Sequence, residues 1–256
     1  MKKIANDLLG LVNVRITKRS SFEKLISNLN STEDLELLKA VSPESRSDCL
    51  DNLSYSKSQL RQDLFVLAEL GFQKEGFFVE FGATNGMDLS NTYILEKRFG
   101  WNGILAEPAE MWQKDLRKNR KANIETKCVW TSSGENIVFN ETEVGELSTV
   151  DSFSDTDKHK KSRKSGKRYT VETIALLDLL DKFEAPKLID YLSIDTEGSE
   201  YEILKNFDFD KYKFRVITCE HNYTSKREKI FDLLTKNGYA RKFEEISKFD
   251  DWYVLA

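Results

Sequence analysis

The chain has 256 residues, of which 39% are hydrophobic and 11% aromatic, enough to bury the core of one large domain and too many for wholesale disorder. Its 39 basic and 43 acidic residues leave a formal net charge of -4, which excludes a general nucleic-acid binder because such proteins need a net basic face. No apolar run approaches the roughly 18 to 20 residues of a membrane span, and three widely spaced cysteines without a metal motif predict a reducing, cytoplasmic setting.

Residues 1–72 form a segment that we predict to be mostly helical. Apolar residues recur there at spacings of three and four, separated by polar breaks such as residues 42–44. The first apolar stripe, over residues 4–12, is flanked by lysines and arginines. It fits either a peripheral helix on a membrane surface or a helix docked on the core or on a second subunit, and we favour docking.

Strands and helices alternate over residues 73–256, which we assign to the second domain. Short β-branched and aromatic runs predict strands at 77–81, 103–106, 126–131, 136–140, 188–195, 216–219, 239–246 and 252–255. Apolar residues at helical spacing predict helices at 91–99, 109–121, 171–183, 200–206 and 226–236. This alternation predicts an α/β fold with a mostly parallel sheet, and the two last strands suggest an antiparallel edge.

The residues that follow the first two strands indicate a nucleoside site. In an open α/β sheet, ligands bind beyond the carboxyl ends of the strands, where the strand order reverses. Glu80 ends the first strand and leads into a turn with Gly82 and Gly86, which permits close backbone approach to a ligand. Glu107 follows the second strand, 21 residues past Gly86, where a carboxylate binds the hydroxyls of a ribose. An acidic loop beside such a carboxylate favours a nucleoside with a cationic amino-acid tail, such as S-adenosylmethionine.

Two longer blocks carry a resemblance to a known family. The first, residues 76–108, begins GFFVEFGATNG, and the second, residues 192–204, contains LSIDTEGSE. Together they resemble the FkbM family of S-adenosylmethionine-dependent methyltransferases over roughly residues 56–256. The resemblance implies a Rossmann-like class I methyltransferase fold, with a mostly parallel seven-stranded sheet whose last strand is antiparallel. It also implies an O-methyltransferase, because the family mostly methylates oxygen on sugars and natural products.

The resemblance implies a set of cofactor-binding residues at the strand ends: Glu80, Gly82, Gly86, Ser90, Asn91, Glu107, Val129 and Trp130. The first loop would line the methionine end of the cofactor, and Glu107 would bind the ribose. Ser90 and Asn91 open the first helix, where a polar side chain can face the cofactor carboxylate. Val129 and Trp130 would lie at the adenine edge, and for Trp130 both stacking on the ring and ordinary core packing stay open.

Ionisable side chains after the fourth and fifth strands suggest the catalytic machinery. Methyl transfer needs the acceptor oxygen about 3 to 3.5 Å from the methyl carbon and a group that takes its proton. Asp195, Glu197 and His221 are the catalytic candidates, with a histidine held only by its neighbours as the alternative for His221. The oxygens of Asp195, Glu220 and Asn222 also fit Mg²⁺ or Mn²⁺, unless the acids merely cap the next helix.

Residues 158–168 hold seven lysines or arginines, and their polar surroundings predict a mobile loop. It is either a solvated loop without a partner or a lid that attracts an anionic acceptor, such as a nucleotide sugar or an acidic polysaccharide. Nucleic acid is disfavoured as a partner because no aromatic side chains alternate with these charges.

We therefore expect a soluble, cytoplasmic methyltransferase that acts on a hydroxyl of a carbohydrate in a surface polysaccharide, a glycan or a natural product. One alternative is a dinucleotide oxidoreductase on the same fold, which Glu107 suits but the glycine spacing of the first loop does not. The other is a binding module that has lost its chemistry, and the acids at Asp195, Glu197 and Glu220 speak against it.

Overall fold

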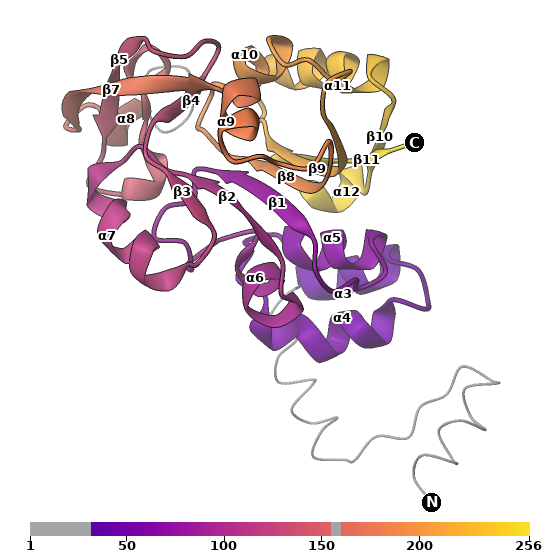
Figure 1. Ribbon diagram of the computed structural model, residues 1–256. Helices are drawn as coiled ribbons and strands as arrows, with labels where there is room; N and C mark the ends of the chain where they lie inside the picture. Colours follow the sequence, from indigo (N-terminus) through magenta and orange to yellow (C-terminus); the bar gives the residue numbers. More distant parts are fainter. Residues whose placement is uncertain (1–31, 155–159) are drawn as a thin grey trace, which may run out of the picture.

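A seven-stranded sheet runs through the computed structural model, which describes residues 32–154 and 160–256 (Figure 1). In spatial order its strands are β10 (Tyr239–Lys242), β11 (Asp250–Leu255), β9 (Lys213–Glu220), β8 (Leu188–Ile194), β1 (Phe77–Phe81), β2 (Asn102–Ala106) and β3 (Asn123–Glu125). Neighbouring strands are parallel except where β11 runs antiparallel to β9 and β10. This confirms the predicted α/β class and the antiparallel last strand.

The strand order reverses between β1 and β8, which are parallel neighbours although more than a hundred residues separate them. From β1 the chain proceeds outward through β2 and β3, and from β8 it proceeds to the opposite side through β9. At such a switch point the loops after β1 and β8 leave in opposite directions, and a crevice opens at their carboxyl ends.

Helices cover both faces of the central sheet (Figure 1). One apolar cluster joins the sheet to α9 (Leu176–Lys182), α10 (Glu200–Lys205) and α11 (Lys226–Lys236). A second cluster joins the other face to α3 (Thr32–Ala40), α4 (Arg46–Asn52), α5 (Gln62–Glu69), α6 (Tyr93–Phe99) and α7 (Glu110–Asn119). Strand β1 serves both clusters, because Val79 and Phe81 face one side while Phe78 faces the other.

A second, four-stranded sheet lies beside the carboxyl ends of the central strands, at the upper left of Figure 1. In spatial order it consists of β4 (Cys128–Trp130), β7 (Lys167–Ala175), β5 (Asn136–Glu141) and β6 (Thr149–Val150). Short helical turns complete the described chain: η1 (Leu53–Tyr55), η2 (Gly145–Leu147), η3 (Asp151–Phe153), α8 (Lys160–Arg163) and α12 (Glu244–Ser247).

The predicted third strand, at 126–131, is wrong in its placement. The third strand of the central sheet is β3, and residues 128–130 form β4 in the second sheet. The chain turns between the two strands because the Glu125 carboxylate accepts hydrogen bonds from the backbone N–H groups of Thr126 and Lys127. A local side-chain bond of this kind interrupts a strand without leaving a hydrophobic pattern in the sequence.

Two further boundaries differ from the prediction. The predicted helix 171–183 begins only at Leu176, because residues 167–175 pair with β5 as a long strand that suits their β-branched side chains. The predicted strand 239–246 ends at Lys242, since Phe243 adopts a left-handed backbone conformation and α12 follows. The described part of the basic run is likewise ordered, as α8 and the start of β7.

Several sequence predictions concern the chain ends and its surface. The apolar stripe at 4–12 lies outside the described residues, and the domain boundary at residue 72 stays a prediction.

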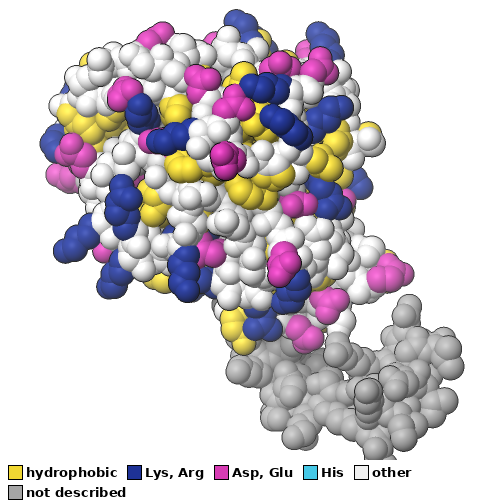
Figure 2. All heavy atoms as spheres, viewed as in Figure 1, with side chains coloured by type: hydrophobic (Ala, Val, Ile, Leu, Met, Phe, Trp, Pro, Cys, Tyr) yellow, Lys and Arg dark blue, Asp and Glu magenta, His cyan; other side chains and the backbone are white. Residues whose placement is uncertain are grey.

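Over residues 32–154 and 160–256, no helix has the length and apolar character needed to cross a membrane. The three cysteines are buried and unpaired. On the face in Figure 2, basic and acidic side chains are interspersed.

Candidate active site

A cavity of about 390 Å³ opens at the carboxyl ends of β1, β2, β8 and β9. The loops that follow these strands line one side of the cavity, and the second sheet with the turn at 144–148 lines the other. Its volume falls within the range of small-molecule sites. The cavity thus lies at the switch point where the sequence places the ligand.

Gly82 brings the loop after β1 against the loop after β8. Its φ angle is 72°, and a Cβ atom at this position would lie 1.9 Å from the carbonyl oxygen of Asp195. Only glycine tolerates both the left-handed conformation and this contact. The two sequence blocks that carry the family resemblance therefore touch in space at one residue.

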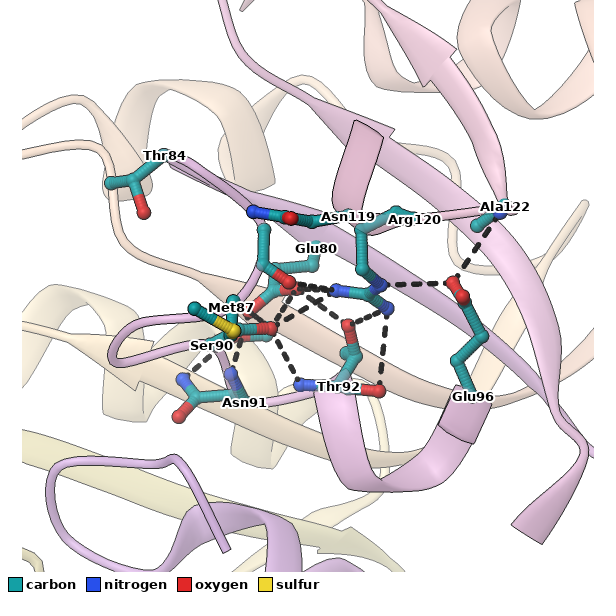
Figure 3. Close-up of polar contacts among 12 residues, drawn as sticks. Glu80, Thr84, Met87, Ser90, Asn91, Thr92, Glu96, Asn119, Arg120 and Ala122 are labelled. Carbon is teal, nitrogen blue, oxygen red and sulfur yellow. Dashed lines mark hydrogen bonds and ion pairs between the residues drawn. The ribbon is translucent and has the colours of Figure 1, made fainter. Parts of the chain in front are cut away.

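Glu80 lies at the end of β1, on the cavity lining, and only 3% of its surface is exposed. Its carboxylate accepts hydrogen bonds from the backbone N–H of Asn91 at 2.7 Å and from the hydroxyl of Thr92 at 2.5 Å (Figure 3). The hydroxyl of Ser90 donates to the same carboxylate. Glu80 thereby fixes the start of α6, and through it the side chains of Ser90 and Asn91, which also line the cavity.

Arg120, just beyond α7, supplies the countercharge to Glu80 and escaped the sequence analysis. Its guanidinium lies 3.7 Å from Glu80, and Nε donates to Glu96 at 2.8 Å (Figure 3). The remaining N–H groups donate to the Gly86 carbonyl, to the Ser90 hydroxyl and to both oxygens of Thr92. All five donors are therefore satisfied although the side chain is fully buried. Burial alone would raise the pKa of Glu96, but Arg120 holds it below its usual value.

Gly86 has a place different from the one the resemblance implies. It does not belong to the cavity lining, and a Cβ atom there would lie 2.6 Å from Cγ of Arg120. Its φ angle is 75° and its carbonyl accepts a hydrogen bond from Arg120. Gly86 thus shapes the loop from behind, while Gly82 lines the cavity.

Glu107 follows β2 and lines the cavity with an oriented carboxylate. Its two oxygens accept hydrogen bonds from the backbone N–H groups of Thr84 and Ala109, each at 2.8 Å. Burial raises the pKa of Glu107 to about 7, against the effect of these bonds. Each oxygen keeps a second lone pair, so the group can also accept hydrogen bonds from a ligand diol.

Asn91 presents an unused acceptor at the same cavity. Its Nδ2 donates to the Ser193 hydroxyl at 3.0 Å, and the residue lines the cavity although it is 9% exposed. The Oδ1 atom is buried and has no hydrogen-bond partner among the described residues. Because an unsatisfied buried acceptor is costly, this atom suits a ligand N–H or O–H group.

The adenine edge contains Val129 but not Trp130. Cys128 and Val129 line the cavity, whereas Trp130 lies outside the lining and packs edge-to-face on Phe153, with ring centroids 6.0 Å apart. Of the two alternatives for Trp130, this geometry matches core packing.

Three carboxylates gather at the ends of β8 and β9. Oxygens of Asp195, Glu197 and Glu220 lie within 4.8 Å of one another, and all three residues line the cavity. Asp195 is reached by solvent from the cavity while protein surrounds its other sides. Burial and then the charge of Asp250 raise the pKa of Asp195 to about 7. Burial and the charge of Asp195 raise the pKa of Glu220 well above its usual value. A pair of this kind holds a proton at neutral pH.

Glu197 is paired with a residue of the basic run. Arg163, fully buried, donates to Glu197 Oε2 at 2.8 Å and to the Leu147 carbonyl, so α8 is joined to the cavity wall. Asn222 turns its amide nitrogen toward the same Glu197 oxygen, at 3.2 Å. Among the predicted metal ligands, Asp195 and Glu220 therefore lie together, with Glu197 beside them. The sequence analysis could not single out Arg163, because nothing in the sequence distinguishes it from the other basic residues of the run.

His221 lies in the cavity's surroundings but is not part of its lining. Its Nδ1 accepts a hydrogen bond from the backbone N–H of Tyr223 at 3.0 Å, and its Nε2 lies 3.8 Å from Asp251. Burial lowers the pKa of His221. Its Nε2 is buried and has no hydrogen-bond partner among the described residues. The absence of His221 from the lining favours a histidine held by its neighbours, and its catalytic role stays a prediction.

The profile of the methyltransferase FkbM domain matches residues 80–249. No curated protein matches the chain significantly. Similar solved structures include the METTL16 methyltransferase domain, at 14% identity over 77% of this chain and 66% of that one, with a TM-score of 0.42. Another is precorrin-6y C5,15-methyltransferase from Geobacter metallireducens GS-15, at 12% identity over 75% of this chain and 85% of that one, with a TM-score of 0.41.

Proposed function

The chain belongs to the FkbM family of S-adenosylmethionine-dependent methyltransferases, and on that premise we propose that it methylates a hydroxyl oxygen of a carbohydrate, within a surface polysaccharide, a glycan or a natural product. The observation that carries the proposal is the Asp195–Glu220 pair, which faces the same cavity as Glu107. A ribose-binding carboxylate at one end and a proton acceptor at the other are what hydroxyl methylation requires.

The residues present fit the cofactor. Glu107 would accept hydrogen bonds from the ribose hydroxyls, and Val129 would pack on the adenine. The unpaired Asn91 Oδ1 would accept from the amino group of the methionine moiety, and Gly82 leaves room for it at the loop. When bound, S-adenosylmethionine supplies a methyl group on a positively charged sulfur, and four acidic residues at the strand ends, Glu80, Glu107, Asp195 and Glu220, favour that charge.

Asp195 is the proposed general base. Transfer of the methyl group forms a carbon–oxygen bond at the acceptor, breaks the carbon–sulfur bond and releases the hydroxyl proton. The Asp195 carboxylate, which solvent reaches from the cavity, takes that proton. A base with a pKa of about 7 is matched to a reaction at neutral pH. Burial and the charge of Asp195 also raise the pKa of Glu220, whose side chain lies beside Asp195 and holds it in place.

The rest of the lining suits a sugar ring. Gln59, Asp88 and Asn222 add groups that can exchange hydrogen bonds with hydroxyls, while Leu89 and Phe249 offer apolar surface for a ring face. Leu89 is 49% exposed, which places an apolar side chain at the open side of the cavity. Such a mixture of convergent polar groups and apolar patches is typical of small-molecule sites.

A divalent cation is the second candidate for activating the hydroxyl. The oxygens of Asp195, Glu197 and Glu220 form a hard donor set of the kind that Mg²⁺ and Mn²⁺ prefer. Such an ion would lower the pKa of a bound hydroxyl and replace the shared proton. Loss of activity in EDTA that Mg²⁺ or Mn²⁺ restores would establish this variant of the mechanism.

Calorimetric titration of the purified protein with S-adenosylhomocysteine and, separately, with NADH tests the cofactor. We expect micromolar binding of S-adenosylhomocysteine and no heat with NADH. Binding of NADH alone would instead establish the oxidoreductase alternative. If neither compound gives a heat of binding, the alternative of a non-catalytic binding module would be favoured. The acceptor is then tested by the release of S-adenosylhomocysteine in the presence of simple glycosides.

A further inference from the structure

A second cavity, of about 300 Å³, is formed by the chain around η1 and by α6. Its lining consists of Ser54, Tyr55, Lys57, Tyr93, Ile94, Lys97 and Arg98. The same two segments also line the active-site cavity, through Gln59 and Asn91. In each segment the two linings are two residues apart, which is at most about 7 Å of extended chain. Ser58 also pairs with Leu89, at the open side of the active-site cavity. The second cavity therefore adjoins that open side.

The second cavity is positively charged. Lys57, Lys97 and Arg98 line it, and no carboxylate of the described chain does. Lys97 is paired with Glu96 at 2.7 Å, whereas Lys57 and Arg98 form no ion pair within residues 32–154 and 160–256. Two cations without a countercharge on one concave surface attract an anion, and salt screens this attraction.

Arg98 is held in one orientation with its terminal nitrogens free. Its Nε donates a hydrogen bond to Oδ1 of the buried Asn52 at 2.6 Å, and its Cζ lies 4.0 Å from the ring centroid of Tyr55. Asn52 is itself fixed, because its Nδ2 donates to the Asp48 carbonyl at 2.7 Å. Neither terminal nitrogen of Arg98 donates to a described residue. An arginine fixed in this way matches two oxygens of a carboxylate or a phosphate.

The rest of the lining suits a sugar that carries such an anion. The hydroxyls of Ser54, Tyr55 and Tyr93 can exchange hydrogen bonds with sugar hydroxyls. Ile94 and the two tyrosine rings offer apolar surface for a ring face. A bare phosphate ion would contact the basic groups and leave this surface unused.

We propose, building on the proposed function, that the second cavity is a subsite for an acidic glycan and binds the carboxylate or phosphate of the sugar unit next to the one that is methylated. Arg98 contacts two oxygens of the anion, and Lys57 adds a second charge. The unit that receives the methyl group then lies in the active-site cavity, across the segment at 57–59. The described residues of the basic run, 160–168, line neither cavity, so we assign the attraction of an anionic acceptor to Arg98 and Lys57.

Calorimetry of the protein saturated with S-adenosylhomocysteine tests the subsite with three sugars that share the glucose ring: methyl glucoside, methyl glucuronide and glucose 6-phosphate. We expect at least one of the two anions to bind about tenfold or more tightly than the neutral glucoside, and high salt to reduce the difference. The two anions distinguish a uronate from a phosphate as the preferred group. If neither anion binds more tightly than the glucoside, the proposal is wrong.

Arg98→Gln and Lys57→Gln each remove one charge at an exposed position. Each should weaken binding of the anion by about fivefold or more, while the affinities for the glucoside and for S-adenosylhomocysteine stay the same. Arg98→Lys keeps the charge but not the planar fork, so it should recover part of the loss. Arg117→Gln, at an exposed position of α7, is the matched control, and Lys164→Gln tests the basic run. A loss of anion binding in Lys164→Gln but not in Arg98→Gln would overturn the proposal.

Cellobiose and its counterpart with a terminal glucuronate test the link to the acceptor. Release of S-adenosylhomocysteine gives kcat and KM for both disaccharides. We expect a lower KM for the acidic one, and Arg98→Gln should raise that KM with kcat unchanged. An equal or lower KM for cellobiose contradicts the role of the subsite in acceptor binding. If neither disaccharide is methylated although S-adenosylhomocysteine binds, the carbohydrate acceptor of the proposed function is wrong, and calorimetry alone then decides whether the second cavity binds an acidic sugar.

Discussion

The guanidinium of Arg120 lies 3.7 Å from the carboxylate of Glu80, and both side chains are buried, Glu80 at the cavity lining and Arg120 behind it. This ion pair joins the end of α7 to the end of β1, across the loop at 82–92. Since Glu80 also holds the backbone of Asn91, the position of the loop depends on a charge from a residue that itself never contacts the cavity. We therefore expect Arg120 to act as a positioning residue for the loop that would hold the cofactor.

Arg120→Ala should destabilise the protein and weaken cofactor binding together. The change leaves Glu80 buried without its countercharge, at a cost of about 3 to 5 kcal/mol. Chemical denaturation measures the stability, and calorimetry with S-adenosylhomocysteine measures the affinity. Arg120→Lys, which restores the charge but not the five donors, should recover part of both. Arg117→Ala, on the exposed face of the same helix, is the control; unchanged affinity in Arg120→Lys and Arg120→Ala would refute the positioning role.

Asp195→Asn should lower kcat by about 10²- to 10⁴-fold, the usual contribution of a general base. The amide keeps the shape of the side chain, so S-adenosylhomocysteine should bind within a few-fold of the original affinity. Initial rates and calorimetry separate the two effects. Asp232→Asn, at an exposed acid on α11, should change neither. A near-normal rate in Asp195→Asn would remove the proposed base.

His221→Asn should leave methyl transfer largely intact. The asparagine Oδ1 can replace Nδ1 as acceptor for the Tyr223 N–H, while the group at Nε2 is lost. Because Nε2 faces Asp251 and the residue is not part of the lining, we expect a loss of rate far below the 10²-fold of a missing base. A rate that falls as far as in Asp195→Asn would return His221 to the catalytic machinery.

Val129→Phe and Trp130→Phe should separate the two residues at the adenine edge. The larger side chain at 129 enters the cavity, so affinity for S-adenosylhomocysteine should fall by tenfold or more. Trp130 packs on Phe153 outside the lining, so its change should alter stability and leave the affinity nearly constant. Titration calorimetry on both variants decides, and the opposite pattern would indicate stacking of Trp130 on the base.

Stability of the ligand-free protein should fall as the pH rises from about 4 to 7. Burial raises the pKa of Asp250, Asp195 and Glu107 to about 7 in the folded state, far above their values of 3.8 or 4.5 in an unfolded chain. The folded state thus binds the protons more tightly, and its advantage, complete below pH 4, is lost as the pH rises through 7. Each group contributes up to about 1.4 kcal/mol per pH unit in this range.

Asp250→Asn should flatten this dependence, because the amide cannot ionise yet can still accept the hydrogen bond from Gln62. Urea unfolding at several pH values measures the slope. Asp232→Asn again serves as the control, since its side chain is exposed. A slope that stays the same in Asp250→Asn would show that the pKa of Asp250 is not raised.

The sequence predicted those features that depend on local patterns. Strand β1 and helix α11 have the predicted bounds, because their apolar residues follow one period from end to end. Helix α9 and strand β7 were confused, since Ile174 and Leu177 also satisfy helical spacing although the β-branched run pairs with β5. The spacing of apolar residues alone cannot distinguish a helix from a strand when pairing with a distant strand determines the conformation.

The site was predictable where function depends on position after a strand. Gly82, Glu107 and Asp195 line one cavity because strand ends converge at the switch point. Arg120 and Arg163 could not be found in this way, because each acts through a partner on another element and neither lies at a strand end. The partner of a long side chain that reaches across the fold cannot be identified from the spacing of residues in the sequence.

Helices α3, α4 and α5 pack on one face of the sheet, and they limit how far the chain can be shortened. Helix α5 is buried along Leu64 and Phe65, its Gln62 lines the cavity and bonds Asp250, and residue 58 pairs with Leu89 beside the cofactor loop. A fragment cut to the match at 80–249 would lose most of β1 and all of β11 as well as this layer. Such a fragment would be insoluble or inert, so expression trials should retain everything from residue 32 onward.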